Sequence, residues 1–397
     1  MVSRYSNEII EWLNDHAEDD PLKVVLSKSP FDNVSSQELS AQIIGRKIAR
    51  NKYPFLLENT HYRYPVKISL EQSSSQATAE YKTHLMTGPT VIDLTGGMGM
   101  DSILIAKAGN QVTYIEQNEE LCLLNIYNFK ELGLPINVIH NTAEKYLATR
   151  SKTFETVFID PSRRVDGNKK TGVHNLLPNV VDLQSQLLKL APCIVMKLSP
   201  MQDISELVQE LKFVSDIHVV SVKEDVKELL VILERSYTKQ PKLTVTSLLP
   251  QSSEKQKGEL WKLSAPLSSR LIKCNEGTLG KYIYQPHPAI VKAALHDYEA
   301  VKLNLTKIHA NTQLYTSDTF DRNYKGKVFE VLTKTPLQKK VIAKYLPEKK
   351  ANIISKNHPL SPAQIAKKIG FKEGGDLFLI ACTNSENKKI CLVCKRL

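Results

Sequence analysis

Apolar and polar positions along residues 86–234 follow the order expected of an open α/β sheet. Five short apolar runs, each followed by polar residues, predict strands, and segments of helical length separate most of them. Two further apolar runs, at 217–222 and 229–233, flank the charged turn at 223–225 and predict a closing hairpin. The five expected strands are 91–94, 111–115, 136–139, 156–159 and 193–198.

The two ends of the chain have different patterns. Residues 1–85 are expected to form a helical extension, in which capping boxes at Ser35-x-x-Glu38 and Ser73-x-x-Gln76 start two helices. Polar stretches at 237–242 and 250–258 separate the central region from two small α+β modules, 239–325 and 326–397. In the first module, the segment 267–274 and a helix at 288–303 are expected to form a small α+β unit. The second is expected to run strand 327–332, helix 338–346, strand 351–355, helix 361–368, and strands 376–381 and 389–393.

The first strand of the central region leads into a glycine turn and then directly into a helix. Gly96, Gly97 and Gly99 allow a tight turn and a close approach of the backbone to a ligand, and the free amides of the following helix face the same place. The second strand ends at Glu116, nineteen residues after Gly97, where open α/β sheets place the acid that accepts ribose hydroxyls. This arrangement predicts a nucleotide-binding crevice. As a dinucleotide fingerprint it is incomplete, because Ser102 stands where the third glycine is expected.

The pattern resembles class I S-adenosylmethionine-dependent methyltransferases in three places: Asp93 to Gly99, Glu116, and Asp160 to Arg163. Together with the Glu71 to Ser75 run, these motifs also resemble guanine-N2 methyltransferases of the trimethylguanosine-synthase type and bacterial methyltransferases with a THUMP-like domain. The resemblance implies a Rossmann-like α/β domain over 86–238, a ferredoxin-like module and a C-terminal THUMP-like domain that binds RNA. It implies S-adenosylmethionine as cofactor, bound by Asp93, Thr95, Gly96, Gly97, Gly99, Asp101, Glu116, Asn141, Ala143 and Asp160.

The chemistry is expected at the end of the fourth strand. In amino-directed methyltransferases the first residue of an Asn/Asp-Pro-Pro-aromatic tetrad accepts a hydrogen bond from the target amine, and Asp160 and Pro161 fit this pattern. Ser162 replaces the second proline and Arg163 the aromatic residue, so an arginine plane would have to stack on a base or bind phosphate. Lys197, near the end of the fifth strand, adds a cation to the predicted catalytic group. Substrate contacts are expected from Gln72, Ser73, Arg163, Arg164, Lys169 and Lys170, against the alternative that the arginines form scaffold salt bridges.

Charge is divided unevenly along the 397 residues. Residues 1–238 hold 25 lysines and arginines against 30 acids, while residues 239–397 hold 28 against 12, a net of +16. This division predicts a catalytic half joined to a half that contacts RNA phosphates, such as those of tRNA or rRNA, through lysines that include 349, 350, 356, 367, 368 and 372. A lysine-rich solvated surface is the alternative.

Other classes of protein are disfavoured. No apolar run is long enough to predict a membrane span, and the first residues lack a signal-peptide pattern, so a cytoplasmic location is expected. Cys391 and Cys394 are expected to be one core and one exposed cysteine of a strand, with no metal site. An NAD- or nucleotide-dependent enzyme and a non-catalytic RNA-binding protein remain as alternatives, and the sequence does not indicate the oligomeric state.

Overall fold

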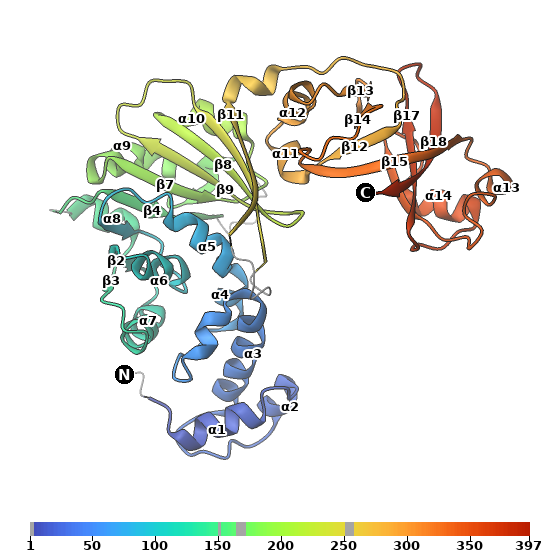
Figure 1. Ribbon diagram of the computed structural model, residues 1–397. Helices are drawn as coiled ribbons and strands as arrows, with labels where there is room; N and C mark the ends of the chain where they lie inside the picture. The colour runs from blue at the N-terminus through green and yellow to red at the C-terminus, as the bar shows by residue number, and fades with distance from the viewer. Residues whose placement is uncertain (1–3, 150–151, 164–171, 251–257) are drawn as a thin grey trace. The chain divides into compact units, whose positions relative to one another are not determined.

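The computed structural model describes residues 4–149, 152–163, 172–250 and 258–397, which form two compact units, 1–264 and 265–397 (Figure 1). The first unit contains a nine-stranded sheet in the order β11-β10-β8-β9-β7-β4-β1-β2-β3. Its strands are β1 (Thr90–Asp93), β2 (Gln111–Glu116), β3 (Asn137–His140), β4 (Thr156–Ile159), β7 (Cys193–Leu198), β8 (Val214–Val222), β9 (Asp225–Glu234), β10 (Lys242–Leu248) and β11 (Glu259–Pro266).

The pairing of these strands confirms the expected α/β class. Strands β3, β2, β1, β4 and β7 pair in parallel, and the predicted hairpin of β8 and β9 closes them, with β9 antiparallel to β7. The carboxyl ends of β1 and β4 therefore lie next to each other at the point where the strand order reverses, which is where such sheets bind ligands. The helices of this region are α6 (Met100–Lys107), α7 (Glu119–Glu131), α8 (Ala143–Thr149), α9 (Val180–Leu190) and α10 (Ile204–Glu210), with a short η2 (Val173–Asn175).

The first sheet continues beyond the boundary expected at residue 238. Strand β10 pairs in parallel with β8 over its whole length, and β11 lies beside β10. Leu243 and Val245 are fully buried, so β10 adds core to the first unit. Strand β10 and the residues of β11 up to 264 therefore belong to this unit and not to the small module that the polar stretches suggested.

The N-terminal extension is helical, as predicted. Ser35 caps α3 by accepting the Glu38 amide, but the second cap differs from the prediction. Ser75, not Ser73, starts α5 by accepting the Thr78 amide, while Ser73 ends α4, because the backbone at 73 is extended. The elements are α1 (Asn7–Asp15), α2 (Pro21–Leu26), α3 (Ser36–Lys52), η1 (Pro54–Glu58), α4 (Lys67–Gln72) and α5 (Gln76–Thr83).

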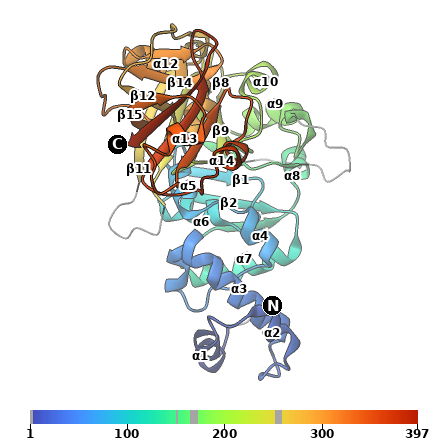
Figure 2. The same ribbon diagram turned by 90° about the vertical axis from the view of Figure 1, so that its right-hand side faces the viewer.

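The extension packs on the glycine-turn side of the sheet. Tyr53, Leu56 and Leu70 share one apolar cluster with Ile103 of α6 and Phe129 of α7. Helix α5 lies beside α6 (Figure 2). Burial of these large side chains stabilises the contact by roughly 1.5–3 kcal/mol each. This packing positions α4 and α5 beside the turn.

The second unit is built on one seven-stranded sheet in the order β13-β14-β12-β15-β18-β17-β16. The predicted C-terminal order of strand, helix, strand, helix, strand, strand is confirmed by β15, α13, β16, α14, β17 and β18. The bounds are β12 (Tyr282–Pro286), β13 (Thr306–His309), β14 (Thr312–Ser317), β15 (Gly326–Thr335), β16 (Asn352–Lys356), β17 (Leu377–Thr383), β18 (Lys389–Arg396), η3 (Leu267–Leu271), α11 (Pro288–Lys292), α12 (His296–Lys302), α13 (Lys339–Ile342) and α14 (Pro362–Ile369).

Several local expectations for this unit need correction. The helix expected at 288–303 is two helices, because Ala294 between them has a φ of +55°. The segment 267–274 contains only the short helix η3, and β13 and β14 were not predicted. Cys391 and Cys394 face opposite sides of β18, as alternation requires, but both are buried since each side of the sheet carries an apolar cluster.

None of the helices in the ranges given above is long and apolar enough to cross a membrane. Across those same ranges, no three His, Cys, Asp or Glu side chains gather in a group able to hold a metal ion.

Candidate functional site at the carboxyl ends of β1 and β4

The turn after β1 depends on glycine at each of its three positions for a different reason. A Cβ on Gly96 would lie 2.1 Å from the Tyr114 ring, so a side chain has no room there. Gly99 has a φ of +82° and its Cβ would approach the Phe129 ring at 2.9 Å. Gly97 has a φ of +54°, yet its Cβ would meet nothing nearer than the Thr95 carbonyl oxygen at 3.8 Å. The turn is therefore packed behind Gly96 and Gly99 and open beside Gly97.

The peptide groups of Gly97 are held from both sides. Its N–H donates to Glu116 Oε2 at 2.8 Å. Its carbonyl accepts from Tyr114 Oη at 2.6 Å and from Asn125 Nδ2 at 3.0 Å. Glu116 Oε1 also accepts the Asn118 amide at 2.8 Å. The acid expected at the end of β2 is thus fixed next to the glycine turn, with α7 supplying a further support that the sequence analysis did not identify.

Asp93 lies inside the turn, where it is 1% exposed. Its Oδ1 accepts the Thr95 amide at 3.0 Å and its Oδ2 accepts the Ser102 hydroxyl at 2.7 Å. Burial raises the pKa of this carboxyl to about 7, although both hydrogen bonds lower it. The bond to Ser102 explains why serine stands at the position of the third glycine. A direct contact between Asp93 and a ligand stays a prediction.

Asp160 follows β4 and is tied to both neighbouring strands. Its backbone N–H donates to Thr95 Oγ1 at 2.6 Å, which connects it to the glycine turn, and its carboxylate pairs with Lys197 of β7. Burial lowers the pKa of Lys197, but the carboxylates of Asp160, Asp101 and Glu228 together raise it above its usual range. Lys197, expected only as a cation at this crevice, is thus the ion-pair partner of Asp160.

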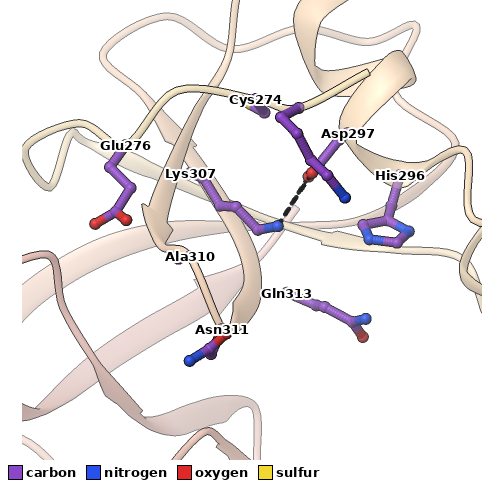
Figure 3. Close-up of a pocket in the computed structure, with 9 residues that line it drawn as sticks. Cys274, Glu276, His296, Asp297, Lys307, Ala310, Asn311 and Gln313 are labelled. Atoms are coloured by element: carbon purple, nitrogen blue, oxygen red, sulfur yellow. Dashed lines mark hydrogen bonds and ion pairs between the residues drawn. The ribbon is translucent and has the colours of Figure 1, made fainter. Parts of the chain in front are cut away.

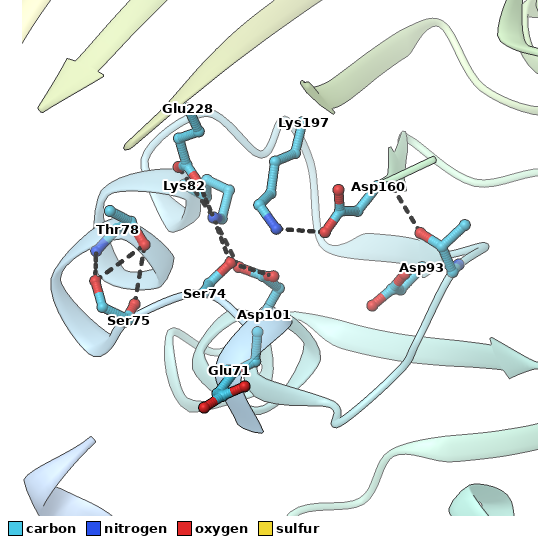
Figure 4. Close-up of polar contacts among 12 residues, drawn as sticks. Glu71, Ser74, Ser75, Thr78, Lys82, Asp93, Asp101, Asp160, Lys197 and Glu228 are labelled. Carbon is cyan, nitrogen blue, oxygen red and sulfur yellow. Dashed lines mark hydrogen bonds and ion pairs between the residues drawn. The ribbon is translucent and has the colours of Figure 1, made fainter. Parts of the chain in front are cut away.

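A buried charge network adjoins this pair (Figure 4). The ammonium group of Lys82, on α5, is fully buried and lies 3.0 Å from both carboxylate oxygens of Glu228 and from Asp101 Oδ1. It also donates to the Ser74 hydroxyl at 2.9 Å, which donates in turn to Asp101 Oδ2 at 2.8 Å. Asp101, expected to bind the cofactor, is thus also part of a network that joins α5, α6 and β9.

The segment at 70–75 reaches this network through Ser74, which the sequence did not single out. Ser74 contacts Asp101, whereas the Ser73 hydroxyl donates to the Leu70 carbonyl and meets Tyr53 Oη at 3.1 Å. Gln72 is exposed at the end of α4. Lys52 donates to the carbonyls of Leu70 and Glu71, so the extension holds this segment by its backbone. Substrate contacts from Gln72 and Ser73 stay predictions.

The remaining predicted residues are placed as follows. The Asn141 amide donates to the Glu116 carbonyl at 3.0 Å, which brings the end of β3 beside that of β2, and Ala143 begins α8 as a buried residue. Pro161 is buried, and Ser162 and Arg163 form the short strand β5 (Ser162–Arg163), paired with β6 (Leu176–Leu177). The predicted substrate residues Arg164, Lys169 and Lys170 lie outside the described residues.

Comparison with known proteins places this geometry in a protein class. The structure matches the crystal structure of a "putative methyltransferase" from Porphyromonas gingivalis W83 with 27% sequence identity and a TM-score of 0.84. The match covers 99% of this chain and 100% of the Porphyromonas gingivalis chain. Residues 282–324 match a ferredoxin-like domain family, and residues 326–396 match the THUMP domain-like family. The fold and domain order are those of an S-adenosylmethionine-dependent methyltransferase. The resemblance to bacterial methyltransferases with a THUMP-like domain is confirmed, and the dinucleotide alternative is disfavoured.

Two curated relatives resemble shorter parts of this chain. Ribosomal RNA small subunit methyltransferase J of Coxiella burnetii is 35% identical over 82 residues, which are 18% of this chain and 32% of that protein. The protein of the same name from Francisella tularensis subsp. novicida is 26% identical over 121 residues, 24% of this chain and 50% of that protein. The chain thus spans a third to a half of the length of these relatives.

The residues present fit S-adenosylmethionine. The open space beside Gly97 would be filled by any Cβ, and Glu116, which fixes the adjoining peptide, stands where this fold holds ribose hydroxyls. The N-terminal amides of α6 complete a polar surface suited to a nucleoside. We expect Glu116, Gly97 and the residues from Asn141 to Ala143 to hold the nucleoside part of the cofactor.

Gly96→Ala tests the packed side of the turn. The added methyl group would have to displace the Tyr114 ring, which itself holds the Gly97 carbonyl, so affinity for S-adenosylhomocysteine should fall below detection in calorimetry. Gly109→Ala is the matched control, since its Cβ meets nothing within 4 Å and only its left-handed backbone costs about 1 kcal/mol. Equal affinities in the two variants would show that the turn does not form the cofactor site.

Asp93→Asn should change how stability depends on pH. The pKa of Asp93 is raised from 3.8 to about 7 in the folded protein, so the folded state binds the proton more tightly than the unfolded state. As the pH rises from 3.8 to about 7, the wild type loses stability, because Asp93 releases its proton less readily in the folded state than in the unfolded state. Asparagine does not titrate, so the Asp93→Asn variant does not lose this stability. The wild type should therefore become less stable relative to Asp93→Asn from about pH 4 to pH 7, and the difference should level off above pH 7. Tryptophan fluorescence in denaturant titrations measures it, and a pH-independent difference would contradict the burial argument.

Proposed function

We propose that this protein transfers a methyl group from S-adenosylmethionine to a base nitrogen of structured RNA, with guanine N2 as the favoured acceptor. The observation that carries the proposal is the position of Asp160, which follows β4, bonds through its backbone to the glycine turn, and pairs with Lys197. A carboxylate at this position suits a weakly basic exocyclic amine, because it accepts an N–H and so orients the nitrogen lone pair.

The residues of this chain divide the work. Glu116 and the glycine turn hold the nucleoside of the cofactor, which supplies an electrophilic methyl group when it is bound. Asp160 accepts a hydrogen bond from the target amine and is placed to take the proton that the nitrogen loses as it gains the methyl group. Lys197 fixes the direction of the Asp160 carboxylate, and the Lys82 network fixes α5 and α6 beside it.

RNA as the substrate class is supported by the second unit and by the names of the relatives. The second unit carries the THUMP domain-like match, and both curated relatives are ribosomal RNA methyltransferases. Three predicted phosphate-binding lysines also come together there. Lys350 and Lys372 form a β-bridge, and the Lys372 amide donates to the Lys349 carbonyl at 2.9 Å, with all three residues exposed. Such a group of lysines suits phosphate contacts that position an RNA.

A comparison of acceptor classes tests the proposal. Purified full-length protein is incubated with tritiated S-adenosylmethionine and, separately, with unmodified ribosomal RNA, unmodified tRNA, and a protein fraction from the same cells. We expect label in an RNA fraction, and more in ribosomal RNA than in tRNA. Label in the protein fraction alone would overturn the substrate class. Binding of S-adenosylhomocysteine with no transfer to any fraction would favour the alternative of a non-catalytic RNA-binding protein.

A further inference from the structure

A pocket of about 520 Å³ is lined wholly by residues of the second unit (Figure 3). Three segments form it: the residues before β12, the start of α12, and the hairpin of β13 and β14. The segment at 273–277 runs along β13, since Glu276 bridges Lys307 and the Gly277 amide donates to the Lys307 carbonyl at 2.9 Å. The pocket is lined by Lys273, Cys274, Glu276, His296, Asp297, Lys307, Ala310, Asn311 and Gln313.

The floor of the pocket is a buried ion pair. Lys307 and Asp297 are almost fully buried and form an ion pair, with Lys307 Nζ 3.0 Å from Asp297 Oδ1, and the Tyr315 hydroxyl also donates to Asp297. The positive charge of Lys307 balances the negative charge of Asp297, so the ion pair adds no net charge to the pocket. The Tyr315 hydroxyl gives the carboxylate a second partner. This buried pair forms the floor on which the polar side chains of the pocket lie.

The side chains around this ion pair can form hydrogen bonds with a ligand. Figure 3 shows Glu276, His296, Asn311 and Gln313 disposed around Lys307. Among the described residues, His296 Nδ1 is buried without a hydrogen-bond partner. Burial lowers the pKa of His296, although Asp297 opposes the shift, so the neutral ring offers both a donor and an acceptor. The carboxamides of Asn311 and Gln313 add two further groups that each donate and accept.

This set of groups matches a nucleotide. Carboxamides form paired hydrogen bonds with the edges of bases, and an imidazole ring can stack on a base face. Lys273, which is exposed at the rim, provides a cation for the attached phosphate. The pocket volume is within the range of small-ligand sites and leaves room for a whole nucleotide.

We propose that this pocket takes up one unpaired nucleotide of the RNA substrate, with Asn311, Gln313 and His296 contacting the base and Lys273 contacting the phosphate. A base can enter only when it is not paired, so the pocket would select RNA with a loop, bulge or single-stranded end over continuous duplex. The assignment rests on the proposed function, because it takes the occupant to be part of the RNA that is methylated.

The test compares two double variants of the full-length protein. Lys273→Ala/Gln313→Ala removes one lysine and one glutamine from the pocket. Gln338→Ala/Lys340→Ala removes the same residue types from exposed positions at the start of α13, outside the pocket. Fluorescence anisotropy gives the Kd of each protein for an RNA hairpin with an unpaired loop and for a blunt RNA duplex of equal length.

We expect the pocket variant to bind the hairpin about tenfold more weakly than the wild type, because it loses a base contact and a phosphate contact. The control should weaken hairpin and duplex alike by about twofold, as loss of one surface charge does. Both variants should keep the wild-type affinity for S-adenosylhomocysteine. A 4-thiouridine in the loop should crosslink to peptides that contain residues 273–277 or 311–313.

The possible failures are distinguishable. If the pocket variant binds the hairpin as the control does, the pocket assignment falls while RNA remains the substrate. If the wild type binds neither RNA, both the pocket assignment and the proposed substrate class fall. If the pocket variant loses binding of free mononucleotides while its RNA binding is unchanged, the pocket serves a free nucleotide and the RNA assignment is overturned.

Discussion

Asp160→Ala is expected to reduce methyl transfer by about 10²-fold or more, because the target amine loses the group that orients its lone pair and accepts its proton. Affinity for S-adenosylhomocysteine should change little, since the backbone bond from residue 160 to Thr95 survives the substitution. The loss should therefore fall on turnover and not on cofactor binding. Single-turnover rates with the RNA identified by the acceptor comparison, together with calorimetry, measure the two effects.

Two further variants separate chemistry from general charge effects. Asp160→Asn keeps an acceptor oxygen but loses the charge that pairs with Lys197, so its rate should lie between those of the wild type and the alanine variant. Asp225→Ala removes a carboxylate from the exposed ion pair with Lys227 on the same sheet and should keep the wild-type rate. A near wild-type rate for Asp160→Ala would show that the amine is oriented by another residue.

Lys82→Met is expected to destabilise the first unit by about 3–5 kcal/mol, the largest stability effect that the structure predicts. The substitution removes the ammonium group that lies 3.0 Å from both buried carboxylates, Glu228 and Asp101, while the nearby Lys197 stays paired with Asp160; buried carboxylates without a direct partner are costly. The two tryptophans, Trp12 and Trp261, both lie in the first unit, so their fluorescence during denaturant titration reports its unfolding.

Lys227→Met provides the matched control for that experiment. Its ion pair with Asp225 is solvent-exposed, with side-chain exposures of 45% and 70%, so the change should cost less than about 1 kcal/mol. A second double variant, Lys82→Met/Glu228→Leu, should recover part of the lost stability, because it removes one of the stranded charges. Similar small losses for Lys82→Met and Lys227→Met would contradict a structural role for the buried network.

The sequence was sufficient to locate the residues that lie next to strand ends. Glu116 and Asp160 end up beside the glycine turn because parallel strands bring their carboxyl ends together, and Lys197 follows from the same rule. The succession of strands and helices along residues 86–234 and along residues 326–397 was predictable for similar reasons, since each of these strands is an apolar run between polar turns.

The sequence was insufficient where tertiary contacts decide. Lys82 and Glu228 are 146 positions apart, and no local pattern marks either residue as a partner of Asp101. The sequence pattern predicts Tyr114 only as an ordinary strand residue, although its hydroxyl donates a hydrogen bond to the Gly97 carbonyl. Strands β10 and β11 were missed because polar residues flank and interrupt their apolar positions, and because the edge of β8 with which β10 pairs is a tertiary feature that no local pattern marks.

The central claim is methyl transfer to the N2 atom of guanine in RNA, and one measurement tests it most directly. Full-length protein is incubated with S-adenosylmethionine carrying a ¹³C-labelled methyl group and with unmodified ribosomal RNA, which is then digested to nucleosides for mass spectrometry. We predict labelled N2-methylguanosine in the wild-type reaction and its absence with Asp160→Ala. Labelled methyl groups on another atom only, or no labelled nucleoside although S-adenosylhomocysteine binds, would contradict the claim.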